Sequence, residues 1–570
     1  MKGTYSGFRR LTCMIAALAV ICALAVVPAL FPRGACAAAE DYAMMTAFVG
    51  ADETQMNFNW YSFRRTTEQE QLLQIAEGEA GGAFPDEHDE IAVAGALSEG
   101  KVNYYVFKAS VSGLKADTQY VWRVGTAGAW SETCSFRTLP SGEGLRFVAL
   151  GDAQIGTNGD EVSDGAAWQD TLDAAAAVSP AFVLHMGDEV ESFGSGAATL
   201  PQSEREYEQF FGARALRGVP FAGVIGNHEV SKSNWSEHHT FPNLSGSGAS
   251  SSAGAQSGDY WFVAGNVQFF VLNSNVKDDG VHAAFLAEAA EAGREAYGDR
   301  IVWRVAAMHH SLFRGSTLYE QYGEEDIAQR RQSLSAAFTA QDIDLVLTGH
   351  EHIYTRAHMM RGTQPVPAED EKTRHCSVLP DGEILYVTLG TSTGNKVFGV
   401  CPEAEDAPYI AAMYDGAAPQ FAEITVRSGM LKLSTRSAAG EEIDEFTIYK
   451  EDPSAVYPQI AGAEDIAVGI GEAFAPLAGV SAADAIEGEI AVSVEGEADT
   501  SAAGTYELIY TAENTYGNRT QVRRLVTVTE GGGCSSSAAG EAVWPAACMA
   551  VAAAAALKKG GSARRKIINK

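Results

Sequence analysis

The sequence predicts a multidomain protein in which an α/β core lies between two all-β sandwiches. Its 570 residues are too many for one hydrophobic core. In the middle of the chain, apolar β-branched runs alternate with helical stretches, which is typical of a layered α/β domain. On either side, the pattern changes to short strands of alternating apolar and polar residues. We expect an export signal at 1–39, a first β-sandwich at 43–140, the α/β domain at 144–450, a second β-sandwich at 458–529 and a C-terminal tail at 530–570.

The N-terminus has the pattern of an export signal. Lys2, Arg9 and Arg10 precede the apolar stretch Leu11–Phe31, and the small residues Ala35-Cys36-Ala37 then offer a cleavage site. We therefore expect an exported protein. The apolar stretch is also long enough for an uncleaved anchor, and this alternative stays open.

The first β-sandwich is predicted from alternation and from one local motif. Asn103–Ser112 alternates apolar and polar residues, and Leu114–Tyr120 has the spacing of a tyrosine corner ahead of the strand Val121–Val124. This segment resembles a fibronectin type III-like domain. We expect its aromatic residues to form the core rather than a ligand platform: Trp60, Tyr105, Phe107 and Trp122.

The α/β domain contains five apolar runs that predict buried strands. They are Leu145–Leu150, Ala181–Met186, Phe221–Ile225, Ile301–Ala307 and Ile343–Thr348. Helices are predicted at Trp168–Val178, His282–Tyr297 and Ile327–Ala340, and a hairpin at 259–272 turns at Gly265-Asn266.

A polar motif follows each of these five strands. Oxygen and imidazole side chains that meet on loops at strand ends are suitable ligands for a two-metal hydrolytic site. The motifs are Gly151-Asp152-Ala153-Gln154, Gly187-Asp188-Glu189, Gly226-Asn227-His228-Glu229, Met308-His309-His310 and Gly349-His350-Glu351-His352.

This ordered set of motifs resembles the metallophosphoesterase superfamily, and within it the purple-acid-phosphatase-like branch. The resemblance implies a catalytic domain of two sheets packed as a sandwich and flanked by helices, preceded by a fibronectin-like module. It implies two metal ions, with Fe, Zn or Mn as candidates, and hydrolysis of phosphomonoesters by attack of a metal-bound hydroxide. The expected partner is a small phosphorylated substrate.

The resemblance also assigns the ligands residue by residue. Asp152 is expected on the first metal, and Asp188 is expected to bridge both. Asn227 and His309 are expected on the second metal with His350 beside them, and His352 on the first. Because His350 and His352 are two positions apart, an extended segment would turn both to the same side.

Two catalytic residues and four further candidates complete the expected site. His228 is similar to the family histidine that contacts the phosphoryl group or protonates the leaving oxygen. Glu229 is expected to orient His228 through a hydrogen bond, with a solvent-facing Glu229 as the alternative. The further candidates are Gln154, Glu191, His310 and His239. His239 is on a Ser/Asn-rich loop that would form a substrate rim, with plain exposed surface as the alternative.

Two of these positions depart from the family pattern. Glu191 stands where purple acid phosphatases carry a tyrosine that binds ferric iron, so we expect no purple colour. Gln154 stands where many metallophosphoesterases have a histidine, and its amide oxygen is a weaker ligand. The missing tyrosine puts an obligatory ferric ion in doubt.

The C-terminal part resembles a surface module with an anchor. Tyr506, Leu508 and Tyr510 alternate onto one face, as in a bacterial Ig-like domain. Behind it, the apolar segment Ala542–Leu557 is short of the ~20 residues that span a bilayer, but a basic cluster follows it, as at a cytoplasmic stop. We expect attachment to the membrane at the cell surface, with a disordered Ala-rich tail as the alternative.

The net charge indicates which partners to exclude, and the cysteines indicate which disulfide to expect. The formal net charge of -32 argues against a nucleic-acid groove, which needs clustered Lys and Arg. An oxidising compartment permits a disulfide between Cys376 and Cys401, which leaves Cys134 as a buried thiol on a strand. The alternatives to a monoesterase are a phosphodiesterase or nucleotidase with the same site, and a surface adhesin with a degenerate phosphatase domain.

Overall fold

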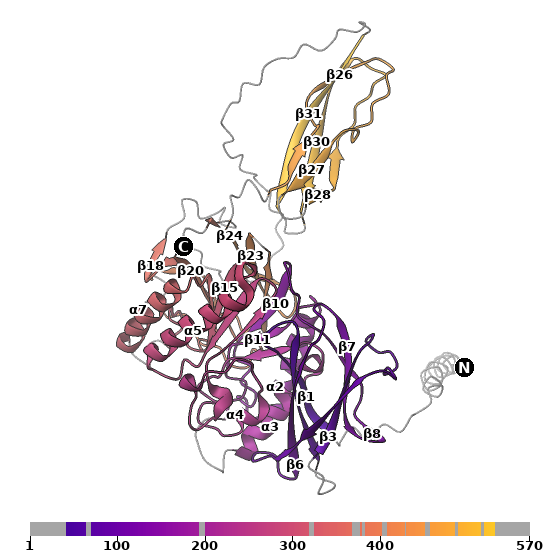
Figure 1. Ribbon diagram of the computed structural model, residues 1–570. Coiled ribbons are helices and arrows are strands. Elements are labelled where there is room, and N and C mark those ends of the chain that lie inside the picture. Colours follow the sequence, from indigo (N-terminus) through magenta and orange to yellow (C-terminus); the bar gives the residue numbers. More distant parts are fainter. Residues whose placement is uncertain are drawn as a thin grey trace, which may run out of the picture.

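The structure is a computed structural model and contains three parts in chain order (Figure 1). The predicted export signal, the apolar C-terminal segment and Cys376 lie outside the residues that it describes, so the predictions made for them stand untested. The described residues are 42–63, 70–192, 200–318, 324–366, 377–378, 382–401, 407–427, 429–450, 457–484, 488–514 and 518–530.

The first part is a β-sandwich whose inner faces bury large aromatic rings. Trp60 and Phe107 stack with ring centroids 5.3 Å apart, and Phe58 contacts Trp122 at 4.8 Å. The backbone N–H of Lys115 donates to the Tyr120 hydroxyl at 3.0 Å, which confirms the tyrosine corner. The strands are β1 (Tyr42–Val49), β2 (Gln55–Phe63), β3 (Glu70–Glu77), β4 (Asp89–Ala94), β5 (Ala96–Leu97), β6 (Tyr104–Ser112), β7 (Gln119–Thr126), β8 (Ala129–Trp130) and β9 (Cys134–Arg137).

Cys134 lies on β9 as a buried free thiol, as expected. Burial raises the pKa of this thiol to about 12, because an apolar surrounding disfavours the thiolate.

The central part is built on two sheets that pack face to face. The Phe147 ring from the first sheet contacts the Phe269 ring from the second at 5.1 Å, and Phe182 contacts Phe269 at 5.2 Å. The first sheet contains β10 (Leu145–Leu150), β11 (Val183–His185), β12 (Phe221–Gly223), β22 (Gln420–Val426), β23 (Met430–Ser437), β24 (Glu442–Tyr449) and β19 (Ser377–Val378). The second contains β13 (Tyr260–Ala264), β14 (Val267–Leu272), β15 (Trp303–Met308), β16 (Leu345–Thr348), β17 (Tyr354–Arg361), β18 (Gln364–Val366), β20 (Glu383–Thr388) and β21 (Ile410–Tyr414).

Helices cover the outer faces of both sheets, which confirms the predicted layering (Figure 1). α2 (Glu161–Ala176) packs Trp168 against His185 of β11, with ring centroids 5.4 Å apart. α5 (Asp279–Tyr297) and α7 (Glu324–Ala340) share an apolar cluster with the second sheet that includes Leu286, Phe338 and Val346. The shorter helices are α3 (Leu200–Phe210) and α4 (Trp235–His238).

Several helices differ from the sequence-based expectation. α2 begins seven residues before the predicted start at Trp168, because Asp160 caps it by accepting from the Ser163 N–H at 3.1 Å. α3 was not predicted at all. Its sequence is mostly polar, and only Tyr207 and Phe210 among its large apolar residues enter the core.

The first sheet runs without interruption from the central part into the N-terminal sandwich. Its strand order is β19-β24-β23-β22-β10-β11-β12-β1-β2-β6-β5, and β1 pairs in parallel with β12 at Phe48 and Phe221. The Trp122 indole N–H also donates to the Arg217 carbonyl oxygen at 3.1 Å. The N-terminal sandwich and the central sheet are therefore joined through backbone pairing and not only through side chains.

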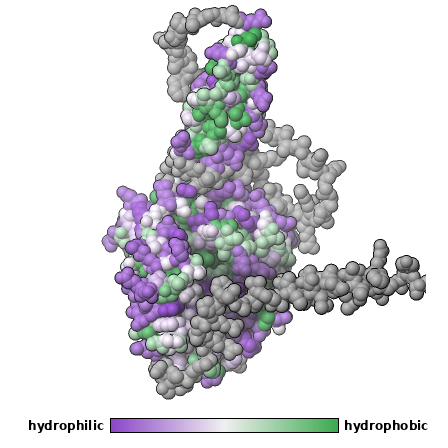
Figure 2. Space-filling model, turned by 90° about the vertical axis from the view of Figure 1, so that its right-hand side faces the viewer, coloured by the Kyte–Doolittle hydropathy of each residue, from purple (hydrophilic) through white to green (hydrophobic). Residues whose placement is uncertain are grey.

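The last part is a separate small β-sandwich. Its longest strands, β30 (Gly504–Glu513) and β31 (Arg519–Thr529), pair along their whole length and bury Leu508 and Tyr510 as predicted. Figure 2 shows apolar residues on its outer surface. The exposed large apolar residues of this sandwich are Ile466, Ile470 and Leu477. The other strands are β25 (Gln459–Ala461), β26 (Ile466–Gly469), β27 (Ser481–Asp484), β28 (Gly488–Ile490) and β29 (Val492–Glu495).

Across the part of the chain that the structure describes, no helix combines the length and the apolar character needed to span a membrane.

Candidate metal centre

The five polar motifs meet where the parallel strands of the two sheets end. β10, β11 and β12 are parallel neighbours in the first sheet, and β15 and β16 are parallel neighbours in the second. Because the carboxyl ends of parallel strands lie at one edge, the loops that follow them gather there. Asp152, Asp188 and Asn227 come from the first sheet, and His309 and His350 from the second.

The backbone at this edge is unusually constrained. Eleven described residues other than glycine have a positive φ, and five of them are candidate ligands. Such conformations cost about 1–3 kcal/mol each and persist where the surrounding structure fixes them, often at active sites. The five are Asp152, Gln154, Asp188, His350 and His352.

The glycines of the motifs allow the ligand loops to approach closely. A Cβ on Gly187, where φ is +90°, would lie 2.7 Å from the Gly226 nitrogen and 2.9 Å from His309 Nδ1. A Cβ on Gly349 would lie 2.6 Å from an Asp152 carboxylate oxygen. The glycines before Asp188 and His350 are thus required by the close approach of the loops.

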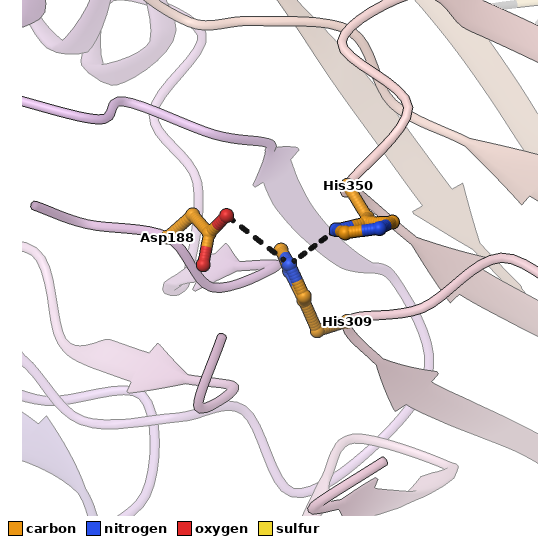
Figure 3. A group of neighbouring side chains, drawn as sticks. All are labelled: Asp188, His309 and His350. Atoms are coloured by element: carbon orange, nitrogen blue, oxygen red, sulfur yellow. Dashed lines mark hydrogen bonds and ion pairs between the residues drawn. The ribbon is translucent and has the colours of Figure 1, made fainter. Parts of the chain in front are cut away.

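Two groups of potential metal ligands share one carboxylate. Asp188, His309 and His350 form one group, and Asp152, Asp188 and His352 form the other, with all ligand atoms of a group within 4.8 Å of one another. Figure 3 shows the first group, in which three separate loops bring the three side chains together. Asp188 is therefore the residue that the two groups have in common.

Hydrogen bonds on the far side of two imidazoles determine which nitrogen faces the site. His309 Nδ1 lies 2.8 Å from the Met186 carbonyl oxygen, and His352 Nδ1 lies 2.9 Å from that of Lys396. A carbonyl oxygen only accepts, so both Nδ1 atoms carry hydrogen. The Nε2 atoms are left to the site, which is the usual arrangement for metal-binding histidines.

The remaining predicted ligands lie within the same small volume. His309 Nε2 is 3.0 Å from Asn227 Oδ1, 3.1 Å from His350 Nδ1 and 3.3 Å from Asp188 Oδ2. His352 Nε2 is 3.5 Å from Asp152 Oδ1. The His350 backbone N–H also donates to the Asp152 carboxylate at 2.9 Å. All six residues predicted as ligands are thus brought together.

The electrostatics of these groups favour bound cations. Burial raises the pKa of the Asp152 carboxyl well above its usual range. Burial opposes a charged His309, but the Asp188 carboxylate outweighs it and raises the pKa of His309 to about 9. Asp152 and His309 therefore tend to hold protons, because the buried carboxylates need positive charge nearby to balance them. Oxygen and imidazole donors of this kind fit Zn, Mn or Fe(II).

Gln154 supplies a further indication that the donor set fits a metal ion. Its side chain is buried, its Nε2 is 3.3 Å from Asp188 Oδ2, and its Oε1 is a buried oxygen with no hydrogen-bond partner. An unsatisfied buried oxygen is costly unless something binds it. A cation beside Asp152 and Asp188 would satisfy this atom.

His228 lies at the edge of the two groups. Its Nδ1 donates to the Glu191 carbonyl oxygen at 2.5 Å, so Nε2 points to the site, 2.9 Å from Gln154 Nε2 and 3.8 Å from Asp188 Oδ2. This is a suitable position for exchanging a proton with a group held between the ligands.

Glu229 is fully buried, so the solvent-facing alternative is wrong. Its carboxylate accepts from the backbone N–H groups of Gly226 at 2.9 Å, Asp188 at 3.1 Å and Val190 at 3.2 Å. Burial, with Asp188 and Glu189 nearby, raises its pKa to about 8. Glu229 therefore holds the Asp188 and Asn227 loops together.

Glu191 and His310 bind to residues outside the two ligand groups. The Glu191 carboxylate accepts from the Thr157 hydroxyl at 2.9 Å and pairs with the Lys396 ammonium at 3.4 Å. His310 Nδ1 is 2.8 Å from the Ser274 hydroxyl. In the described part of the chain neither residue belongs to a ligand group.

The interpretation of His239 as part of an exposed loop or substrate rim is wrong, because the side chain is completely buried. Its ring stacks on Trp235 at 3.6 Å, and Nε2 lies 3.0 Å from Glu189 Oε1. Strands of the N-terminal sandwich cover the loop, where Asn59 donates to the His238 carbonyl oxygen and Lys108 to that of His239. The polar residues of this loop therefore belong to a buried network of hydrogen bonds.

The pair formed by His239 and Glu189 leads to a prediction about stability. Burial raises the pKa of Glu189 and lowers that of His239, so both are neutral, and the carboxylic acid donates to Nε2. We expect His239→Leu to lower the free energy of unfolding by about 2 kcal/mol, because it leaves this buried donor unsatisfied. Glu189→Gln keeps a donor in place and should cost much less. Urea unfolding followed by tryptophan fluorescence measures both, and equal losses would contradict a neutral pair.

Sequence reasoning missed a loop at 273–277 that borders the site. The Asn275 side-chain amide donates to the carbonyl oxygens of Ile225 and Gly226, both at 3.2 Å, and so ties the loop to the segment before Asn227. His282 of α5 supports it from behind, with Nδ1 2.7 Å from Asp259 Oδ2 and Nε2 3.0 Å from the Val276 carbonyl oxygen. No motif marks this loop, and only its position after β14 would have indicated it.

His282 should make stability depend on pH. Burial and Arg330 oppose its charge, but the Asp259 carboxylate outweighs them and raises the pKa above the ordinary value of 6.5. The stabilisation is therefore complete below about pH 6.5 and is lost as pH rises through the folded-state pKa. Urea unfolding across this range should show less pH dependence for His282→Gln than for the natural protein. An unchanged slope would contradict a protonated His282.

Glu351 was part of a predicted motif without a role. It lies buried between the two histidine ligands, and its carboxylate accepts from Arg314 Nε at 2.7 Å and from the Ser316 hydroxyl at 2.6 Å. On the opposite side, the Thr391 hydroxyl donates to the Asp152 carbonyl oxygen at 3.0 Å. These bonds hold the ligand loops from outside, and they involve residues distant in the sequence.

Three family models match the chain and account for its three parts. Residues 43–138 match the N-terminal domain of purple acid phosphatases, residues 145–354 match the calcineurin-like phosphoesterases, and residues 458–528 match the Ig-like domain of bacterial surface proteins. The predicted resemblance and fold class are confirmed. The central match supports a metal-dependent phosphoester hydrolase and implies divalent metal ions.

Two curated proteins and one solved structure are similar to this chain. Two uncharacterized proteins of Mycobacterium tuberculosis, from strains CDC 1551 / Oshkosh and ATCC 25618 / H37Rv, are each 28% identical over 355 residues. The match covers 55% of this chain and 63% of theirs, which is less than two thirds of the length of those relatives. The structure of purple acid phosphatase PPD1 from yellow lupin (Lupinus luteus) seeds aligns with a TM-score of 0.55 at 15% identity, covering 72% of this chain and 74% of that chain. The two share a fold.

Proposed function

We propose that this protein is a surface-located phosphatase that holds two metal ions and hydrolyses phosphomonoesters. The observation that supports this most is the sharing of Asp188 by two groups of ligand atoms, each within 4.8 Å. One shared carboxylate in that position would hold two cations side by side. It would bring less negative charge to the site than two separate carboxylates. Two adjacent ions are the arrangement used for in-line displacement at phosphorus.

Each side chain has a role in this proposal. Asp152, Asp188 and His352 would hold the first ion, with Gln154 Oε1 as an additional donor, and the second ion would be held by Asp188, Asn227, His309 and His350. Bound divalent ions polarise phosphoryl oxygens and lower the pKa of a coordinated water. Glu229 and Thr391 keep the ligand loops in register before any ion or substrate arrives.

His228 is the proposed proton donor to the leaving oxygen. Its Nδ1–H is fixed on the Glu191 carbonyl oxygen, so the ring can gain and release a proton only at Nε2, which faces the site. In the structure this atom accepts from the Gln154 amide at 2.9 Å. A protonated Nε2 instead needs an acceptor, and an ester oxygen held between the ions would supply one.

Phosphate release tests the proposal directly. The purified full chain is incubated with 4-nitrophenyl phosphate and with bis(4-nitrophenyl) phosphate, with Zn, Mn or Fe(II) added, and its metal content is measured by elemental analysis. We expect about two ions per chain and faster turnover of the monoester. Faster turnover of the diester would favour the phosphodiesterase alternative, and absence of turnover with every metal would contradict the proposal.

The surface location rests on the match of residues 458–528 to an Ig-like domain of bacterial surface proteins and on the predicted export signal and tail. Expression of the full chain in a bacterium with antibody labelling of intact cells tests it. Labelling only after lysis would contradict a surface location.

A further inference from the structure

Two histidines of the candidate site are oriented by residues that also form an ion pair with each other. His228 Nδ1 donates to the Glu191 carbonyl oxygen at 2.5 Å, and His352 Nδ1 donates to the Lys396 carbonyl oxygen at 2.9 Å. The Lys396 ammonium lies 3.4 Å from the Glu191 carboxylate. A continuous chain of contacts therefore runs from the proposed proton donor to a proposed ligand of the first ion.

Glu191 is held in place at its backbone and at its side chain. Its backbone N–H donates to the Ile155 carbonyl oxygen at 2.9 Å, and Ile155 and Val190 form a parallel β-bridge. Its carboxylate accepts from the Thr157 hydroxyl at 2.9 Å. The loop that carries Glu191 is thus tied to the loop that carries Asp152, and it offers a fixed carboxylate to a cation.

The segment around Lys396 forms neither helix nor strand. Before it, the Thr393 hydroxyl donates to the Ala153 carbonyl oxygen at 2.9 Å. After it, the Gly399 carbonyl oxygen accepts a backbone N–H at 2.8 Å. The ion pair with Glu191 acts between these two ties, at the residue whose own carbonyl oxygen orients a histidine ligand.

The ion pair is only partly buried. The side chain of Glu191 is 31% exposed and that of Lys396 is 28% exposed. Ion pairs of this kind contribute little to the free energy of unfolding. Removal of the pair should therefore leave the fold intact, so its effect on the site can be measured by itself.

We propose that Glu191 and Lys396 are positioning residues that fix His352 for the first of the two ions. Because Glu191 also orients His228, the pair joins this ligand to the proposed proton donor. The inference rests on the proposed function, because the first ion and the proton donor are taken from it. Loss of the pair weakens binding of the first ion, whereas the second ion, which His352 does not bind, keeps its affinity.

Zinc titration of the metal-free full chain against a chelator tests the proposal without turnover. The first ion is identified as the one that His352→Gln loses. We expect Lys396→Met to weaken that ion by about twofold to fivefold, the usual scale for a partly exposed ion pair, and to leave the other unchanged. Lys396→Arg keeps the charge and should retain the natural affinity. Unchanged affinity for both ions in Lys396→Met, or an equal loss for both, overturns the proposal.

A double-mutant cycle shows whether the two side chains act as a pair. Glu191→Gln should weaken the same ion by a similar factor, and the double variant with Lys396→Met should lose no more than either single variant. Losses that multiply overturn the proposal. The matched control is Lys432→Met, which removes a partly buried ion pair with Glu445 at 3.0 Å in the same domain. It should leave both affinities unchanged, and a loss equal to that of Lys396→Met overturns the proposal.

A measurement on the metal-free chain distinguishes failure of this inference from failure of the proposed function. Selective ¹⁵N labelling of histidine reports how fast the Nδ1–H of His352 exchanges with solvent. We expect exchange about twofold to fivefold faster in Lys396→Met, because the carbonyl acceptor is held less firmly. This result supports the inference even if no zinc binds and no ester is hydrolysed. An unchanged exchange rate overturns it even if both occur.

Discussion

Replacing Asp188 by asparagine is expected to lower kcat/KM for 4-nitrophenyl phosphate by at least about 1,000-fold, because both of the proposed ions would depend on its carboxylate. Asp188 is the member common to both ligand groups. Asparagine keeps the size of the side chain but offers one neutral oxygen where a carboxylate offers two. We expect bound metal to fall below one ion per chain, as measured by elemental analysis alongside kinetics.

The control for Asp188→Asn is a buried carboxylate of the same domain with a structural role. Asp344 pairs with Lys450 at 2.8 Å, so Asp344→Asn should lower stability while the protein keeps its metal and its kcat/KM. Two ions per chain in Asp188→Asn would contradict a bridging role. Equal metal loss in both variants would show that the loss follows from destabilisation.

Replacing His228 by glutamine is expected to lower kcat by about 100- to 10,000-fold while both ions remain bound. The imidazole is not a member of either ligand group in the described residues, yet its Nε2 faces them. Glutamine can donate a hydrogen bond but cannot transfer a proton at neutral pH. The expected signature is therefore a loss in kcat with unchanged metal content.

His88→Ala provides the control for His228→Gln, since His88 lies on the N-terminal sandwich and contacts Phe84 and the Pro85 carbonyl oxygen. This variant should retain full activity. If His228→Gln also lost its metal, the residue would be a ligand or a support for one. If kcat stayed within a few-fold of the natural value, proton transfer by His228 would be refuted.

Much of the fold and of the ligand set was predictable from local sequence. β10 has the bounds expected for it, and β16 ends at Thr348 as expected, because a short, mainly apolar run that ends at a glycine favours a buried strand. A polar residue directly after such a strand is carried to the sheet edge whatever the rest of the chain does. The choice of the six ligand candidates among the polar residues at strand ends came from the resemblance to the family.

The rest depends on contacts between distant segments, which local patterns do not encode. His239 lies in a loop of serine and asparagine, and it is buried only because β2 and β6, more than 100 residues earlier, cover it. The partners of Glu229 are backbone N–H groups, which any residue would offer. Such roles follow from tertiary structure and not from residue type.

The parallel pairing of β1 with β12 has a consequence for how this protein can be dissected. A fragment starting near residue 144 would expose the flank of β12 as an open edge, and unpaired edges recruit other chains. β12 also leads directly into the Asn227 loop. The N-terminal sandwich thus works as a permanent cover for the hydrolase sheet, and an excised hydrolase would tend to aggregate before it could be assayed.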